Sequence, residues 1–233
     1  MTEVVIEAPA KLTLSLRVTG TRPDGYHLID AEMVTIDLVD TLTFRDGDGL
    51  EVVGADVATD DSNLVRRALE AVGRRANVRV EKRIPPGAGL GGGSADAAAV
   101  LRWASVDDVE VAARLGADVP FCLRGGRARV TGIGDQLEPL PFVARTLTVL
   151  LPPFGCSTAD VYRVWDDLGG PRSAGSNDLE PAALVVEPRM AGWRDRLAEA
   201  TGQVPQLAGS GSTWFVEGEF PGADRIVVRT TQS

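Results

Sequence analysis

A glycine-rich stretch, Pro85–Ser94, constrains this chain more than any other feature. It reads Pro-Pro-Gly-Ala-Gly-Leu-Gly-Gly-Gly-Ser and runs directly into alanine-rich sequence from Ala95. Glycine adopts positive φ without steric cost and lets backbone N–H groups approach a ligand closely. Ser94 is a preferred N-cap type, Asp96 suits the positive end of a helix dipole, and the alanines favour helix. A glycine loop that opens onto a helix N-terminus binds anions, so the stretch predicts a phosphate cradle rather than a flexible linker.

The spacing of the glycines matches one common phosphate motif and fails another. The Walker pattern fails because no lysine follows the glycines. The pattern G-x-G-x-x-G matches at Gly87, Gly89 and Gly92, but a dinucleotide fold also needs an acidic residue about 20 positions on, at the end of a strand. Asp107 and Asp108 lie at a tolerable distance but resemble the start of a short helix. A dinucleotide fold is therefore disfavoured, although the spacing alone does not exclude it.

Composition limits the class of partner. The chain has 233 residues, 44% hydrophobic and 24% charged, which is typical of a globular protein with a sizeable core. Its formal net charge of −9 argues against nucleic acid as the main partner, because phosphate backbones need a basic face. A nucleotide in a local pocket is still compatible with this charge. Cys122 and Cys156 are far apart in the sequence and predict neither a disulfide framework nor a zinc site.

The first residues carry no targeting pattern. Met1–Glu7 has no basic segment followed by an apolar one, and no apolar stretch in the chain approaches about 18 residues. These features predict a cytoplasmic protein without a membrane partner.

The order of predicted elements indicates two α+β halves. Leu12, Leu14 and Leu16 alternate with polar residues, which is the period of a half-buried strand. Further predicted strands cover 33–44, 50–53, 78–84, 127–131, 146–151 and 224–229. Predicted helices begin near Asn63, Ala95, Val106 and Ser157, and one covers 190–201. Because a buried-type strand starts a second α+β series near residue 145, we expect domains at 1–145 and 146–233.

Three isolated polar residues have ordinary interpretations when each is taken alone. Lys11 projects opposite the leucines, as a solvated strand lysine does. His27, the only histidine, follows a Pro-Asp-Gly turn. Asp118 is expected at a helix-to-strand junction, where Pro120 biases Val119 toward extended backbone. Such a junction holds one carboxylate rigidly, but a turn aspartate often only bonds its own backbone.

Taken together, five segments resemble one family, the GHMP kinases. In chain order they are Ala-Pro-Ala-Lys-Leu (8–12), Pro-Asp-Gly-Tyr-His (23–27), the glycine stretch (86–94), Leu-Gly-Ala-Asp-Val-Pro-Phe (115–121) and Gly-Ser-Gly-Ser (209–212). Asn-Asp-Leu-Glu (177–180) also fits. The resemblance spans nearly the whole chain. It implies an α+β two-domain GHMP kinase architecture, with a ribosomal-protein-S5-domain-2-like N-terminal half and a shortened, ferredoxin-like C-terminal half.

The resemblance implies a role for each matched residue. Lys11 and Asp118 match the catalytic lysine and aspartate of the family, and Asn63 and Lys82 match positions in its adenosine pocket. ATP is the implied co-substrate, with Mg²⁺ near Ser94. The implied phosphate-binding loop comprises Pro86, Gly87, Ala88, Gly89, Leu90, Gly91, Gly92, Gly93, Ser94 and Ala95.

The resemblance also implies the acceptor. The Asp-Gly-Tyr-His and Gly-Ala-Asp-Val-Pro-Phe segments are similar to the branch that phosphorylates the 2-hydroxyl of a substrate carrying a cytidine diphosphate group, in non-mevalonate isoprenoid precursor synthesis. Tyr26 and Tyr162 match the two rings that stack on cytosine, and His27 the residue that reads the base edge. Thr13 matches a substrate-binding position beside the catalytic lysine, where the family usually has Asn.

Two alternatives remain at this point. The first is another GHMP small-molecule kinase, for homoserine, mevalonate or a sugar, whose acceptor has no base to stack. The second is a nucleotide-binding paralogue that has lost catalysis. Three differences from the family favour this second alternative. They are Thr13, a short segment before Asp118 and a short connection at 218–222.

Overall fold

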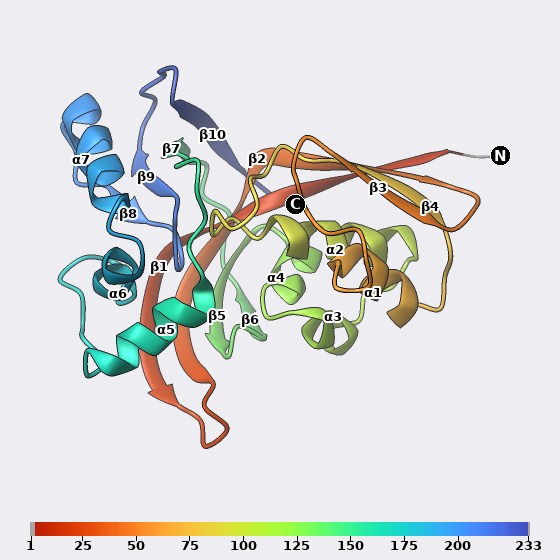
Figure 1. Cartoon of the computed structure of the whole chain (residues 1–233), viewed down its shortest axis with the longest axis horizontal. Coiled ribbons are helices and arrows are strands. Elements are labelled where there is room, and N and C mark those ends of the chain that lie inside the picture. The colour runs from red at the N-terminus through yellow and green to blue at the C-terminus, as the bar shows by residue number, and fades with distance from the viewer. Residues whose placement is uncertain (1–2, 233) are drawn as a thin grey trace.

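A long antiparallel hairpin runs through the whole molecule. Strands β1 (Val4–Thr21) and β2 (His27–Arg45) pair along their full length in the computed structural model, which describes residues 3–232. Gly25, with φ +87°, makes the turn between them. Figure 1 shows this hairpin crossing the molecule, with helices α1–α4 along one part of it and α5–α7 beside the other.

The first group of elements extends the sheet on β2. Strand β4 (Asn77–Glu81) pairs antiparallel with the end of β2 and parallel with β3 (Gly49–Val53). Strand β5 (Arg127–Gly132) pairs with the start of β2 and with β6 (Gln136–Pro139). The helices of this group are α1 (Leu64–Ala71), α2 (Gly92–Trp103), α3 (Val109–Leu115) and α4 (Val119–Arg124).

The second group has its own antiparallel strands. Strand β7 (Thr146–Leu150) lies between β10 (Arg225–Thr231) and β9 (Trp214–Glu217), and β8 (Gln206–Leu207) pairs with β9. The end of β10 also pairs with β2, so the strands form one continuous path. The helices are α5 (Thr158–Asp167), α6 (Glu180–Val186) and α7 (Met190–Thr201). The division into domains 1–145 and 146–233 stays a prediction. Among residues 3–232 no helix is long and apolar enough to span a membrane.

Two hydrophobic cores share the hairpin. In the first, Ala8 and Leu12 of β1 pack with the alanine face of α2. In the second, Leu16 and Val18 of the same strand pack with Trp165 of α5 and other residues of the C-terminal helices. The alternating leucines therefore do form a strand, as predicted, but the strand serves two cores rather than one.

Lys11 and Thr13 lie between two irregularities of β1. The β1–β2 register shifts between Pro9 and Lys11, and again between Thr13 and Ser15. Bulges of this type redirect side chains and are common beside active sites. Both faces of the strand are covered here, since Lys11 is only 5% exposed. The ordinary interpretation of Lys11 as a solvated strand lysine is therefore wrong.

Several local predictions are confirmed. Asn63 caps α1 and Ser157 caps α5, each by accepting a hydrogen bond from a backbone N–H of the first turn. Helix α7 covers Met190–Thr201, as its apolar spacing predicted.

Two local predictions about helix starts are wrong. Ser94 is not the N-cap of α2, because the helix begins at Gly92 and its cap is Gly91, in the left-handed region at φ +69°. A Cβ atom at Gly91 would lie 2.9 Å from Lys11 Cγ, so close packing also requires glycine there. Asp118 is not at a helix-to-strand junction but starts α4. Proline is tolerated in a first helical turn because its missing N–H has no intrahelical partner to lose, so Pro120 does not prevent this helix.

The glycine loop at 86–94 and a second glycine loop, residues 207–213, lie against each other. Thr213 donates from its backbone N and its hydroxyl to the Ala88 carbonyl oxygen, at 3.2 and 2.7 Å. A Cβ atom at Gly89 would lie 2.6 Å from the Gly211 oxygen and 2.7 Å from the Ala208 oxygen. The second loop therefore supports the first from the C-terminal half of the chain.

We expect Gly89→Ala to destabilise the fold more than Gly73→Ala. Both glycines have positive φ, so alanine is strained by about 1–2 kcal/mol at either position. Only Gly89 has backbone oxygens in the way, which should add about 1–3 kcal/mol of overpacking cost. Urea unfolding of the two variants measures the difference, and equal losses would contradict the close contact of the loops.

Candidate active site

One cavity of about 560 Å³ collects most of the predicted site residues. It is lined by residues from β1, the glycine loop, the start of α4, helix α5 and the second glycine loop. The predicted residues that line it are Lys11, Thr13, Asn63, Lys82, Pro86, Gly87, Ala88, Gly89, Leu90, Gly91, Gly92, Gly93, Ser94, Asp118 and Tyr162. Ala95, Tyr26 and His27 do not line it.

The glycine loop ends in a helix N-terminus that faces this cavity. Gly87, Gly89 and Gly91 all have positive φ, which lets the chain turn tightly into α2. The first intrahelical bond runs from Ala95 N to the Gly91 oxygen at 2.8 Å, so the N–H groups before Ala95 have no partner within the helix. Free N–H groups and the helix dipole together favour an anion at this position.

Lys11 and Asp118 form an ion pair at the cavity wall. Lys11 Nζ lies 3.4 Å from Asp118 Oδ2 and donates to Thr13 Oγ1 at 3.1 Å. The Lys11 side chain is 6% exposed and that of Asp118 is 32% exposed. Among residues 3–232 the ammonium has only one carboxylate within 4 Å, at 3.4 Å, and it retains donor capacity for a ligand.

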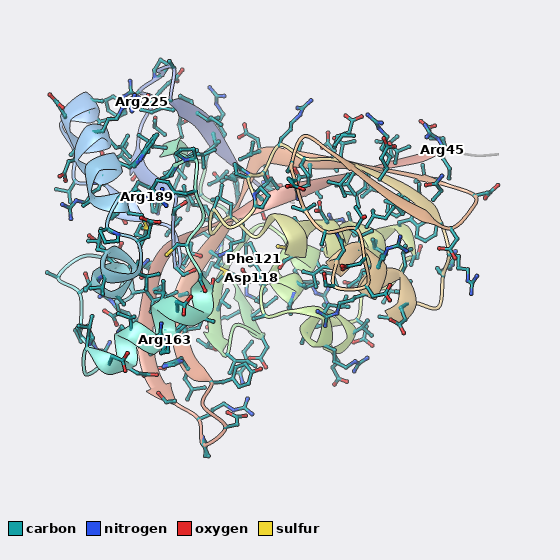
Figure 2. All side chains as sticks on the ribbon, in the orientation of Figure 1. Arg45, Asp118, Phe121, Arg163, Arg189 and Arg225 are labelled. Carbon is teal, nitrogen blue, oxygen red and sulfur yellow. The ribbon has the colours of Figure 1, made fainter. Side chains whose placement is uncertain are left out.

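The local structure of α4 leaves the Asp118 carboxylate available. Asp118 stands at the N-cap position, but its side chain makes no capping hydrogen bond. In Figure 2 Asp118 lies near the centre of the molecule, beside Phe121 of the same helix. Behind it, burial raises the pKa of the Cys122 thiol to about 12, so this thiol is neutral and unreactive at physiological pH.

Lys82 is held in a buried cluster with two carboxylates. Its Nζ lies 2.5 Å from Asp40 Oδ2 and 2.7 Å from Asp96 Oδ2, and all three side chains are less than a tenth exposed. Asp40 also accepts from the backbone N–H groups of Arg83 and Ile84. Asp96 Oδ1, by contrast, has no hydrogen-bond partner within the part of the chain that the structure describes. Burial raises the pKa of Asp96 to about 7, so its carboxyl group is partly protonated near neutral pH.

The aromatic residues are arranged differently from a simple sandwich. The His27 ring stacks on Tyr162, with centroids 4.6 Å apart, and meets Trp165 edge-on at 5.6 Å. His27 Nε2 also lies 2.9 Å from Asp166 Oδ1. Tyr26 is 60% exposed, at the hairpin end of β1 and β2. The structure therefore brings His27 to Tyr162 and leaves Tyr26 outside the cavity.

Several residues at the site have no role assigned from the sequence. Thr158 and Ser210, whose hydroxyl oxygens are 2.8 Å apart, line the cavity. Asp40 belongs to the Lys82 cluster, and Asp96 was noted only as a charge near a helix end. The position of Ser210 within the Gly-Ser-Gly-Ser segment is a sequence signal for a site residue. Nothing near Asp40 in the sequence indicates its buried ion pair with Lys82.

The fold and a family comparison define the class of protein. The family described as "GHMP kinases N terminal domain" matches residues 63–126, from the cap of α1 to the end of α4. A solved structure of mevalonate kinase superposes with a TM-score of 0.60, over 99% of this chain and 100% of that chain, at 13% identity. At that identity the likeness shows the fold, which is the fold of the GHMP kinases.

Two closer relatives identify the family within this class. A protein of Pelotomaculum thermopropionicum described as 4-diphosphocytidyl-2-C-methyl-D-erythritol kinase is 40% identical over 89% of this chain and 86% of its own. A crystal structure of 4-(cytidine 5'-diphospho)-2C-methyl-D-erythritol kinase superposes with a TM-score of 0.78 at 32% identity, over 98% of this chain and 99% of that one. The chain belongs to the family of 4-diphosphocytidyl-2-C-methyl-D-erythritol kinases.

We expect the stability advantage of Asp96→Asn over the unmodified protein to grow with pH. The folded-state pKa of Asp96 is raised from 3.8 to about 7. The stabilisation linked to its protonation is therefore complete below about pH 4 and is lost as pH rises toward 7. Between pH 5 and pH 8 the difference in unfolding free energy should grow by about 1–3 kcal/mol in favour of Asn.

Urea unfolding at each pH gives this difference directly, because all other titrating groups are common to both proteins. Asp107→Asn removes an exposed carboxylate paired with Arg124 and serves as the control for charge removal. A pH-independent difference for Asp96→Asn would contradict a raised pKa.

Proposed function

We propose that this protein catalyses ATP-dependent phosphorylation of the 2-hydroxyl of 4-diphosphocytidyl-2-C-methyl-D-erythritol, in non-mevalonate isoprenoid precursor synthesis. The observation that carries the proposal is the Lys11–Asp118 ion pair, which shares one cavity with a glycine-loop helix N-terminus and Tyr162. Family membership supports the choice of acceptor. The proposal includes a cytoplasmic location.

Phosphoryl transfer needs mainly positioning and electrostatic stabilisation, and the two charged residues suit these tasks. In the proposed mechanism the Asp118 carboxylate accepts the proton of the acceptor hydroxyl. Carboxylates in general are weak bases, so this proton is transferred late in the reaction. The Lys11 ammonium orients the hydroxyl and offsets negative charge on the transferring group. Thr13, which accepts a hydrogen bond from Lys11, keeps the ammonium directed toward the cavity.

The donor half of the proposed site is the glycine loop. The N–H groups from Gly89 to Ser94 bind the phosphates of ATP, and Asn63 and Lys82 border the adenosine side. Asn63 already uses its side chain to cap α1 and to bond the Ala58 oxygen. Because two carboxylates pair with Lys82, its side chain forms part of the wall of the adenosine side and has little unbalanced charge to offer a ligand.

Magnesium suits the residues at this position. In kinase sites Mg²⁺ binds through one or two carboxylates together with substrate phosphates and water. Here the Ser94 hydroxyl and the partly exposed Asp118 carboxylate border the same cavity. When bound, Mg²⁺ neutralises phosphate charge. The Ser94 hydroxyl would hold it together with the phosphates and water.

The acceptor half of the proposed site is aromatic. Tyr162 is proposed to stack on the cytosine, with Tyr26 and His27 as further contacts to the base. The stacking of His27 on Tyr162 means that a base entering here has to share or displace that ring contact. Burial raises the pKa of the Tyr162 hydroxyl, so the ring is neutral at physiological pH.

A coupled ADP-release assay tests the proposal against its alternatives. The purified protein is incubated with ATP, Mg²⁺ and the cytidyl substrate, and separately with homoserine, mevalonate or galactose. Turnover of the cytidyl substrate alone supports the proposal. Turnover of another acceptor indicates a different GHMP kinase, and ATP binding without any turnover indicates a paralogue that has lost catalysis.

We expect Asp118→Ala to lower kcat by about 10²- to 10⁴-fold, as for other losses of a general base. The Kd for ATP should stay nearly unchanged, because the phosphate-binding N–H groups belong to a different element. Steady-state kinetics and calorimetric ATP titration measure the two quantities. Asp107→Ala is the matched control at an exposed position, and a loss of ATP affinity in step with kcat would contradict the assignment.

We expect Tyr162→Ala mainly to raise KM for the cytidyl substrate. Loss of one base–aromatic stack worth about 1–3 kcal/mol corresponds to about a 5- to 150-fold increase. Tyr162→Phe retains the ring and should behave like the unmodified protein. If the KM for ATP rises equally, Tyr162 does not belong to the acceptor side.

A further inference from the structure

The Asn-Asp-Leu-Glu segment has no role in the proposed mechanism, yet its first residue is buried beside the site. Asn177 is 1% exposed, and its side-chain amide makes three hydrogen bonds. Nδ2 donates to the carbonyl oxygens of Leu207 and Gly209, at 2.8 and 2.7 Å, and Oδ1 accepts from Leu179 N at 2.9 Å. One side chain thus holds the second glycine loop at two points.

The loop that Asn177 holds lies next to the proposed catalytic lysine in the same cavity. Gly209 lines the cavity, and a Cβ atom there would lie 3.5 Å from Lys11 Nζ and 3.7 Å from Thr13 Oγ1. The Gly209 backbone therefore forms the wall of the cavity next to the Lys11 ammonium, with room for about one carbon atom between them. A shift of this wall would change where the ammonium points.

Asn177 is itself anchored to the strand that carries Lys11. The backbone of Leu16 in β1 accepts a hydrogen bond from Asp178 N and donates one to Ser176 O, both at 2.9 Å. These two bonds place residues 176–178 as a short parallel partner of β1. The chain of contacts accordingly begins and ends on one strand, from Leu16 through Asn177 and Gly209 back to Lys11.

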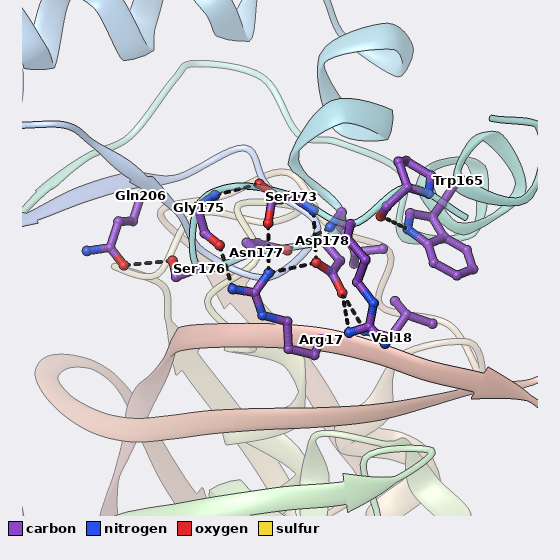
Figure 3. Close-up of polar contacts among 12 residues, drawn as sticks. Arg17, Val18, Trp165, Ser173, Gly175, Ser176, Asn177, Asp178 and Gln206 are labelled. Carbon is purple, nitrogen blue, oxygen red and sulfur yellow. Dashed lines mark hydrogen bonds and ion pairs between the residues drawn. The ribbon is translucent and has the colours of Figure 1, made fainter. Parts of the chain in front are cut away.

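The neighbouring residue fixes the same segment but by other contacts. Asp178 is fully buried, and its carboxylate accepts from Arg17 Nη1 at 2.7 Å, Val18 N at 3.1 Å and Ser173 N at 3.0 Å. Figure 3 shows this carboxylate next to the Arg17 guanidinium and Ser173, with Asn177 close by. Asp178 holds the segment to β1 and makes no hydrogen bond to the second glycine loop, so it offers a matched control.

We propose that Asn177 is a positioning residue, whose side-chain amide fixes the Gly209 backbone against Lys11 and so sets the position of the Lys11 ammonium for phosphoryl transfer. This inference rests on the proposed function. The amide is chemically specific here, because the position needs two donors for two carbonyl oxygens and one acceptor for an N–H. An aspartate of the same shape would set a negative oxygen against those carbonyls. A serine supplies only one donor.

The principal test compares Asn177→Ser with Asp178→Asn. Both variants weaken the anchoring of residues 176–178, but only the first releases the second glycine loop. We expect Asn177→Ser to lower kcat by about 10- to 100-fold, the range for a small misplacement of a catalytic group. Its Kd for ATP should stay within about threefold, and Asp178→Asn, at similar thermal stability, should keep kcat within about threefold. Equal kcat losses in the two variants would overturn the inference.

A double-mutant cycle with Lys11→Ala separates positioning from general damage. If Asn177 acts through Lys11, then Asn177→Ser should cause little further loss of kcat in a Lys11→Ala background, as measured by transfer of labelled phosphate. Fully additive losses would mean that Asn177 supports the fold without orienting the lysine. The Asn177→Asp variant extends the series, and if it does not fold, the serine variant still decides.

Hydrogen exchange provides a readout that needs no turnover. Asn177→Ser should speed amide exchange in 207–213 and in 9–13, whereas Asp178→Asn should speed it in 172–178 and 16–18. If the unmodified protein fails to turn over the cytidyl substrate, the proposed function and the catalytic part of this inference are overturned together. The exchange pattern then still decides whether Asn177 holds the loop against Lys11. Turnover without the expected exchange pattern overturns the inference alone.

Discussion

The backbone of β1 is the frame to which both halves of the candidate site are attached. At Lys11 its N–H donates to the Leu90 oxygen of the glycine loop, at 3.0 Å. At Leu16 it exchanges hydrogen bonds with residues 176–178 of the C-terminal half. Buried backbone groups have to be paired, so these bonds fix where the two loops can lie. The side chain of Lys11 emerges between them, with few conformations open to it.

Two lysines face the same cavity in very different electrostatic surroundings. Lys82 is satisfied by Asp40 and Asp96, so its charge is largely neutralised within the protein. Lys11 has one carboxylate at 3.4 Å and one hydroxyl, and its charge is not balanced to the same degree. A buried ammonium in this state gains most from an anionic ligand, since burial strengthens the attraction that water would otherwise screen. This difference explains why Lys11 suits the proposed chemistry and Lys82 suits the wall of the pocket.

The phosphate cradle depends on both halves of the chain. The first loop turns through glycines with positive φ, and its outer side is in contact with carbonyl oxygens of the second loop at Gly89. Contacts this close admit no Cβ atom. The glycines thus serve two purposes, to expose N–H groups to the cavity and to let a second backbone support the loop from behind.

The sequence by itself determined the local features whose causes lie within a few residues. The glycine stretch predicted a loop before a helix, Asn63 and Ser157 predicted caps, and alternating leucines predicted β1, because φ preferences, capping bonds and side-chain periodicity act over short distances. Five short segments in a fixed order also carried the resemblance to the family, since each preserves one part of a site.

Only the tertiary structure decided how those parts meet. Helix α2 begins at Gly92 and is capped by Gly91 rather than by Ser94. Close packing on Lys11 leaves no room for a Cβ atom at that cap. Asp118 stands at the N-cap of α4, which forms although a residue before proline, here Val119, is biased toward extended backbone. The carboxylates that pair with Lys82 lie 14 and 42 positions away in the chain, and the carbonyl oxygens that accept from Asn177 lie 30 and 32 positions away. No local pattern specifies such pairs. Burial gives these residues their significance, because a charge or amide removed from water must find its partners within the fold, wherever the chain brings them.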